Sequence, residues 1–184
     1  MLFKYHTATR WSHMPTKGKS KGNQGELKIA KFLTDLFEHK FMRVPNSGAA
    51  IGGANAHRKL LMDSVQISYF KSDIIPPSHM RKLVIESKFY KDFPFHKLGT
   101  DQPIAQLEKW IDQTKQTIEP GDVWFVVVRI NHKGSFAVFD SSFAGHFTIK
   151  NYVRYGDCMW VDFEPFFSAN KHAIQQLCET QLGS

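Results

Sequence analysis

The most constraining feature of this 184-residue chain is two apolar runs that meet acidic residues about a dozen positions apart. Asp73 closes the first run, and the second, at residues 83–85, leads directly into Glu86, Ser87 and Lys88. Side chains alternate between the two faces of a β-strand, so an acid and a lysine project side by side from one face. Buried ionised groups are costly unless they are paired or bind a metal. The pattern therefore indicates a functional strand inside an apolar sheet.

These residue types favour metal-assisted chemistry on a phosphate. Mg²⁺ takes oxygen ligands, and carboxylates that converge at a strand end supply them. An adjacent ammonium can orient a metal-bound water for attack on phosphorus. The alternative is an ion pair on a half-exposed strand, because Glu-x-Lys occurs by chance in many strands.

The order Asp…Glu-x-Lys resembles the signature of the PD-(D/E)xK nuclease superfamily, with Ser72-Asp73 in place of Pro-Asp. Further features resemble the archaeal and phage type of Holliday junction resolvase, and these are Glu26, Arg43 with Ser47, and Gln106. The resemblance covers roughly residues 17–140. It implies an α/β protein with a restriction-endonuclease-like α-β-β-β-α-β core, in which a central mixed sheet is flanked by helices.

Each further feature also has an ordinary structural explanation. Glu26 begins the apolar stripe of a helix predicted at 22–37, and it can close a capping box with Asn23. Ser47 belongs to a Pro-Asn-Ser-Gly sequence of common turn formers. Gln106 lies beside the apolar stripe of a second helix, which Asp101 can cap.

The charge is unevenly distributed along the chain. The net charge is +7, and residues 1–60 hold eleven Lys or Arg against three acids. A localised excess of positive charge indicates a polyanionic partner. We expect contacts to DNA from basic residues in the N-terminal part of the chain and from two residues that follow the Glu-x-Lys strand. The N-terminal residues are Lys17, Lys19, Lys21, Arg43, Arg58 and Lys59, and the later two are Lys91 and Gln106.

Two loops have alternative interpretations. The glycine-rich segment 51–59 can contact DNA near the site or form a charged surface hairpin. Residues 89–100 interleave aromatic and basic side chains, which can stack on unpaired bases. The alternative for this loop is that its phenylalanines pack back onto the core or onto a partner subunit.

Several classes of function are disfavoured. The sequence has no apolar run long enough to span a bilayer and no pattern of a signal peptide, so we expect the cytoplasm, or the host cytoplasm for a phage protein. A nucleotide cofactor is not expected, because the P-loop motif is absent. The only cysteines, Cys158 and Cys178, are expected to be free thiols.

We divide the chain into a basic arm at 1–21, a nuclease core at 22–140 and a C-terminal extension at 141–184 that packs on the core. A strand is predicted at 123–130, where the apolar run is nearly continuous. A turn then leads to a strand at 136–139, and a helix is predicted at about 165–180.

The resemblance implies a Mg²⁺-dependent endodeoxyribonuclease, with Mn²⁺ as a substitute, that cleaves four-way DNA junctions as a homodimer. Asp73, Glu86 and the backbone carbonyl of Ser87 would hold the metal, with Glu26 as a further or water-mediated ligand. Lys88 would position the water, and Ser47 and Arg43 the scissile phosphate. The alternatives are another nuclease of the superfamily (restriction-like, flap- or end-processing) and a non-catalytic DNA-binding module.

Overall fold

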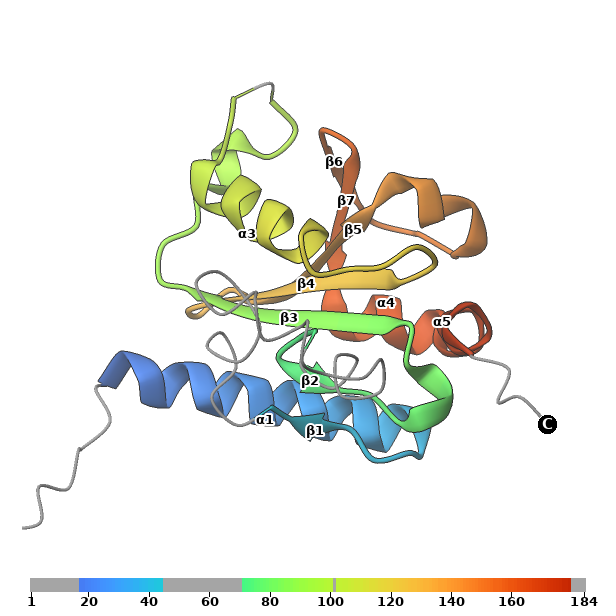
Figure 1. The fold of residues 1–184 in the computed structure, drawn as a ribbon. Helices are drawn as coiled ribbons and strands as arrows, with labels where there is room; N and C mark the ends of the chain where they lie inside the picture. Colours follow the sequence, from blue (N-terminus) through green and yellow to red (C-terminus); the bar gives the residue numbers. More distant parts are fainter. Residues whose placement is uncertain (1–16, 45–70, 101, 180–184) are drawn as a thin grey trace, which may run out of the picture.

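A five-stranded mixed sheet lies at the centre of the computed structural model, which describes residues 17–44, 71–100 and 102–179 (Figure 1). The strand order is β3-β4-β5-β7-β6, and the bounds are β3 Leu83–Tyr90, β4 Val123–Ile130, β5 Gly134–Asp140, β6 Val153–Tyr155 and β7 Cys158–Asp162. β3 and β4 are parallel, and the other neighbours pair antiparallel. The expected α/β class with a helix-flanked mixed sheet is confirmed.

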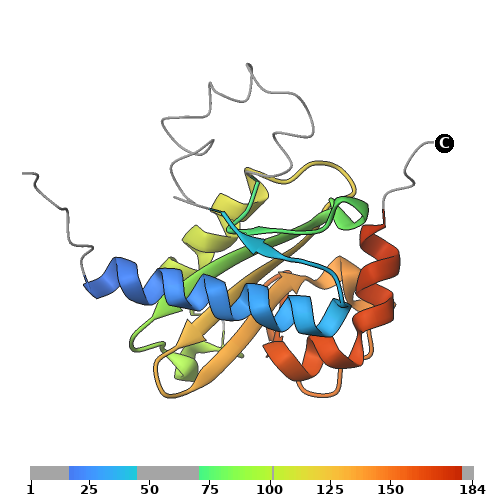
Figure 2. The same cartoon turned by 90° about the horizontal axis from the view of Figure 1, so that it is seen from below.

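Helices cover both faces of this sheet (Figures 1 and 2). One face packs against α1 (Lys17–Phe37), α4 (Phe163–Ala169) and α5 (Lys171–Cys178), and the other against α3 (Ala105–Lys115). β4 is buried on both sides, which explains its continuous run of Val, Trp and Phe. Its predicted bounds are confirmed.

Helix α1 begins at Lys17, five residues before the predicted start. Lys17, Lys19 and Lys21 therefore belong to the helix and not to an arm that precedes it. Asn23 lies inside the helix and not at its N-cap, so the capping box, the alternative explanation for Glu26, is wrong. The predicted apolar stripe is confirmed, because Glu26, Ala30, Leu33 and Phe37 are all buried.

Two short strands, β1 (Met42–Arg43) and β2 (Ile74–Ile75), form an antiparallel pair between α1 and β3. Asp73 directly precedes β2, whereas the sequence suggested that it ends a strand. Pro76 and Pro77 follow β2 and end it, because proline has no backbone N–H to donate. A 3₁₀ turn, η2 (Ser78–Met80), then leads to β3. The predictions for Ser47, Arg58, Lys59 and the glycine-rich segment lie outside the described residues.

The chain beyond residue 140 is part of the same core. After a 3₁₀ helix, η4 (Ser141–His146), β6 and β7 extend the sheet, and Phe163, Phe167 and Ile174 pack in the core. The single helix predicted at 165–180 is two helices that meet at Asn170. The Asn170 side chain accepts from Thr148 N and donates to the carbonyls of Thr148 and Phe166, which stabilises this break.

Helix α3 begins after Ile104, so the predicted cap by Asp101 is wrong. The predicted apolar stripe is correct at Leu107, Ile111 and Thr114, and Trp110 is buried beside them. Across the three described ranges, no helix combines the length and the apolar character needed to cross a membrane.

Candidate active site

The side chains of Glu86 and Lys88 lie on one face of β3, as the alternation predicts. Val84 packs in the cluster on the α3 side of the sheet, and Ile85 packs in the cluster on the α1 side. Lys88 Nζ donates a hydrogen bond to Glu86 Oε2 at 2.6 Å. The ion pair proposed as the ordinary alternative is therefore present, and the groups around it determine whether it can also take part in chemistry.

Asp73 joins this pair from the segment before β2. Its N–H donates to the carbonyl of Ile85 at 3.2 Å, and its own carbonyl accepts from Val44 N at 2.9 Å. Its Oδ2 atom accepts from the backbone N–H of Ser87 at 2.8 Å and lies 3.7 Å from Lys88 Nζ. The structure thus brings Asp73, Glu86 and Lys88 together at β3, the terminal strand of the sheet.

Burial and the close approach of the charged groups shift the pKa values of Glu86 and Lys88. Burial, and then the neighbouring Asp73 carboxylate, raise the pKa of Glu86 to about 7, although Lys88 acts in the opposite direction. Burial by itself would lower the pKa of Lys88, but the carboxylates of Glu86 and Asp73 raise it overall. Lys88 is therefore a charged ammonium at neutral pH, and one cation faces two acidic groups.

The donor atoms at this edge fit a hard divalent cation. The N–H and C=O of one strand residue point to the same side, so the Ser87 carbonyl faces the edge where Asp73 lies. Two carboxylates and a carbonyl are all oxygen donors, and Mg²⁺ commonly takes one or two carboxylates and completes its shell with waters and substrate phosphates. Mn²⁺ accepts the same donor types. A further positive charge here would also offset the burial and the Asp73 repulsion that raise the pKa of Glu86.

Glu26 is held by a different partner. It is 8% exposed, and its carboxylate forms an ion pair with Arg43 Nε. Arg43 Nη2 also donates to Asn23 Oδ1 at 2.9 Å, so the guanidinium ties β1 to α1. Within the described part of the chain, no three His, Cys, Asp or Glu side chains are grouped to hold one ion, so Glu26 is not gathered with Asp73 and Glu86.

The aromatic loop after β3 packs mainly on the protein itself. Phe93 is buried and stacks on Trp160 with ring centres 4.7 Å apart, and Phe95 meets Phe136 edge to face. Packing on the core, the second of the two interpretations, is therefore the one observed for these rings. Lys91 is exposed, and so is His96 in the short 3₁₀ helix η3 (Phe95–Lys97).

Gln106 lies in the first turn of α3 and is partly exposed. No hydrogen bond described for residues 71–100 and 102–179 joins its side chain to Asp73, Glu86 or Lys88. Its predicted role in DNA binding stays a prediction.

One buried cation near the site was missed from the sequence. Lys71 lies two residues before Asp73 and is only 5% exposed. Its partners are Glu119 and Asp122, about fifty positions away. Lysine is normally a surface residue, and no local pattern in the sequence signals that this one is buried.

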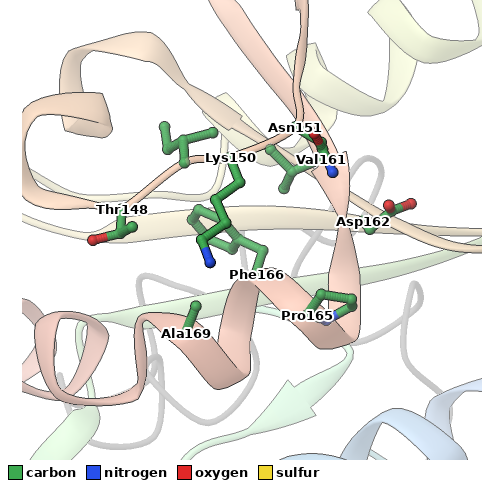
Figure 3. Close-up of a pocket in the computed structure, with 9 residues that line it drawn as sticks. Thr148, Lys150, Asn151, Val161, Asp162, Pro165, Phe166 and Ala169 are labelled. Atoms are coloured by element: carbon green, nitrogen blue, oxygen red, sulfur yellow. The ribbon is translucent and has the colours of Figure 1, made fainter.

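A separate hollow of about 120 Å³ lies between β7 and α4, with Lys150, Phe166 and Asp162 on its lining (Figure 3). In the sheet, β4 and β5 separate β7 from β3. The hollow is therefore distinct from the cluster of Asp73, Glu86 and Lys88.

A comparison with protein families agrees with this arrangement. The family model described as "Phage putative PDDEXK endonuclease" matches residues 17–176. No curated protein and no solved structure matches the chain. The matched range includes the catalytic candidates and also the strands and helices beyond residue 140. The expected superfamily is confirmed, and a specific likeness to Holliday junction resolvases is not part of the match. The chain therefore belongs to this phage PDDEXK endonuclease family, within the PD-(D/E)xK superfamily.

Proposed function

We propose that the protein is a Mg²⁺-dependent endodeoxyribonuclease, with Mn²⁺ as a substitute ion, whose active site is the edge of β3. The observation that carries the proposal is the gathering of Asp73, Glu86 and Lys88 from separate segments of the chain. Asp73, Glu86 and the Ser87 carbonyl would hold the metal. Glu26 would act through a water, since its carboxylate is engaged by Arg43.

The bound ion would lower the pKa of a coordinated water and offset charge on the phosphate oxygens. The protein's own part is to orient and to stabilise charge. The Ser87 N–H fixes the Asp73 carboxylate, and Lys88 fixes that of Glu86. Because its pKa is raised, Lys88 serves as a fixed positive charge for the transition state and not as a general base.

The finer part of the proposal is the substrate. We propose four-way DNA junctions, cleaved by a homodimer in the cytoplasm of the cell or of the phage host. The support is the order of the motif residues and the basic character of residues 1–60. A near two-fold symmetric junction also suits a symmetric dimer with two active sites. Lys17, Lys19, Lys21, Arg58, Lys59, Lys91 and Gln106 would contribute DNA contacts, while Ser47 and Arg43 would lie near the scissile phosphate.

The test is a cleavage assay on end-labelled DNA of defined shape. A four-way junction, a flap, a linear duplex and a single strand are incubated with protein in Mg²⁺ or in EDTA, beside the Glu86→Gln variant. Mg²⁺-dependent cuts placed symmetrically in the junction, absent with the variant, support the full proposal. Equal cutting of linear duplex or preferred cutting of flaps leaves the nuclease assignment and removes the junction. Binding without any cleavage favours the non-catalytic alternative.

A further inference from the structure

The three residues that lead into β2 are polar and yet buried. Lys71, Ser72 and Asp73 are 5%, 7% and 6% exposed. Lys71 Nζ lies 2.5 Å from Glu119 Oε2 and 3.0 Å from Asp122 Oδ2. The Lys71–Asp122 pair is buried on both sides, and a buried ion pair adds little stability compared with apolar side chains of the same size, so we expect it to have a role besides stability.

The partners of Lys71 belong to the turn that starts β4. Asp122 Oδ2 also accepts from the N–H of Glu119 at 2.7 Å, and Asp122 N donates back to the Glu119 carbonyl at 3.0 Å. The next residue, Val123, donates to the carbonyl of Lys82 at 2.8 Å, which begins the pairing of β4 with β3. The ammonium of Lys71 is thus anchored to a closed turn that is continuous with the catalytic sheet.

Among the described residues, three hydrogen bonds of the main chain and of Ser72 hold the segment around Asp73. β1 and β2 are two residues long each, so within the described ranges their pairing contributes only a short ladder of backbone hydrogen bonds. The backbone of Asp73 donates to the Ile85 carbonyl and accepts from the N–H of Val44. The Ser72 hydroxyl donates to the Ile74 carbonyl at 2.8 Å. The Lys71 side chain ties the same segment to the turn that starts β4, the strand next to β3.

We propose that Lys71 is a positioning residue, whose ion pairs with Glu119 and Asp122 hold the Asp73 carboxylate against the N–H of Ser87. Its importance for catalysis rests on the proposed function. The positioning itself does not, because it concerns a hydrogen bond within the protein. A displacement of about 1 Å in such a group can cost a nuclease on the order of a hundredfold in rate.

The decisive measurement is amide hydrogen exchange at Ser87 in the metal-free protein, followed by NMR. Asp73→Ala shows the exchange rate when the acceptor is absent. Lys71→Met, which keeps the unbranched shape and most of the length of the side chain and removes its charge, should raise Ser87 exchange by roughly tenfold, toward the Asp73→Ala value. Lys71→Arg should return most of the protection, because its guanidinium also reaches two carboxylates.

Two control variants separate positioning from general loss of stability. Lys171→Met removes a lysine ion pair that joins the start of α5 to Glu38, the residue after α1. Ile174→Ala removes core volume in α5 and should lower the melting temperature at least as much as Lys71→Met. Neither should change Ser87 exchange beyond what the melting temperature accounts for.

The cleavage assay adds a second readout. In Lys71→Met the Mg²⁺ concentration for half-maximal cleavage should rise by about tenfold, while KM for DNA stays within about twofold. If Ser87 exchange in Lys71→Met equals that of Ile174→Ala at matched stability, the inference is overturned, whatever the cleavage result. If Ser87 exchange rises but wild-type protein cuts no DNA, positioning stands and the proposed function fails.

Lys71→Met is at risk of not folding, because it leaves Asp122 buried without its cation. If Lys71→Met does not fold, Glu119→Gln is the variant that tests the inference. The Glu119 side chain is 58% exposed, so the loss of its charge should leave the protein folded. A smaller rise in Ser87 exchange in this variant supports the inference, and unchanged exchange overturns it.

Discussion

The carboxylate of Asp73 accepts a hydrogen bond at 2.8 Å from the backbone N–H of Ser87, the residue between Glu86 and Lys88. Together with the bond from Asp73 N–H to the Ile85 carbonyl, this bond joins Asp73 to the Glu-x-Lys strand and sets both carboxylates beside a single ammonium. An amide donor stabilises the charged form of a carboxylate, so it fits an acid that serves as a metal ligand. The chemistry we propose depends on this contact between β3 and the segment that precedes β2.

Replacing either acid by its amide should abolish cleavage. In Asp73→Asn and Glu86→Gln the shape is kept, but a charged ligand is lost together with one negative charge that faces the phosphates. DNA binding, measured by fluorescence anisotropy in Ca²⁺, should therefore stay intact or tighten. A variant that keeps more than about a tenth of the wild-type rate, an effect below roughly 1.4 kcal/mol, would show that its residue is not a primary ligand.

Lys88→Ala should lose catalysis, and Lys88→Arg should restore it only in part. The planar guanidinium cannot replace a compact point charge that sits 2.6 Å from Glu86 Oε2. Single-turnover cleavage rates at saturating protein give the comparison, with Lys109→Ala on the exposed side of α3 as the control. Full activity in Lys88→Ala would leave only the structural ion pair as its role.

Without metal, the protein should lose stability as the pH rises from about 4.5 to about 7, as the Glu86 carboxyl titrates. The folded protein holds this proton up to a pKa of about 7, whereas the unfolded chain releases it at its ordinary value, so the folded state binds more protons in this window. Melting temperatures in EDTA at both ends of the window measure the loss. Glu86→Gln should show a smaller loss.

Melting temperatures also test whether Mg²⁺ binds at Glu86. Mg²⁺ at the high end of this pH window should raise the melting temperature of the wild type and leave that of Glu86→Gln nearly unchanged, because binding to the folded state is stabilising. An equal response of both proteins to Mg²⁺ would mean that the ion binds elsewhere.

Neutralising Lys17, Lys19 and Lys21 together by glutamine should weaken binding to every form of DNA alike. It should also flatten the slope of log K against log salt, by about 0.9 for each duplex phosphate contact that is lost. The preference for branched over linear DNA should persist. The matched control removes three exposed lysines elsewhere, Lys109, Lys133 and Lys150, with the same change in net charge. An equal change of slope in both triple variants would contradict a specific role for the start of α1.

Asn170→Ala should destabilise the fold by about 1–3 kcal/mol, the usual cost of leaving buried polar groups without partners. Asn170 is 4% exposed, and its amide satisfies the Thr148 backbone and the Phe166 carbonyl between α4 and α5. Urea unfolding gives the free energy, and Asn151→Ala, at an exposed position, is the control. A loss below about 0.5 kcal/mol, the ordinary range for surface substitutions, would mean that the break needs no side-chain support.

Local periodicity in the sequence was enough to place β3, β4, α3 and most of α1, because each buries a regular stripe or a continuous apolar run. The alternation along β3 also determined that Glu86 and Lys88 share a face, since this depends only on the geometry of an extended chain. The motif order indicated the superfamily for a different reason: the residues needed for the chemistry occur in a recognisable order along the chain.

Tertiary structure decided which charged groups meet. Glu26 pairs with Arg43, and Lys71 is buried against Asp122, because α1, β1 and the turn before β4 are packed around β3. No property of Lys71 or of its neighbours in sequence distinguishes it from a surface lysine. β6 and β7 were missed because their three and five residues are too short for a clear period, and their pairing depends on β5. Contacts between distant segments are set by the packing of the whole sheet, and local sequence patterns carry little information about them.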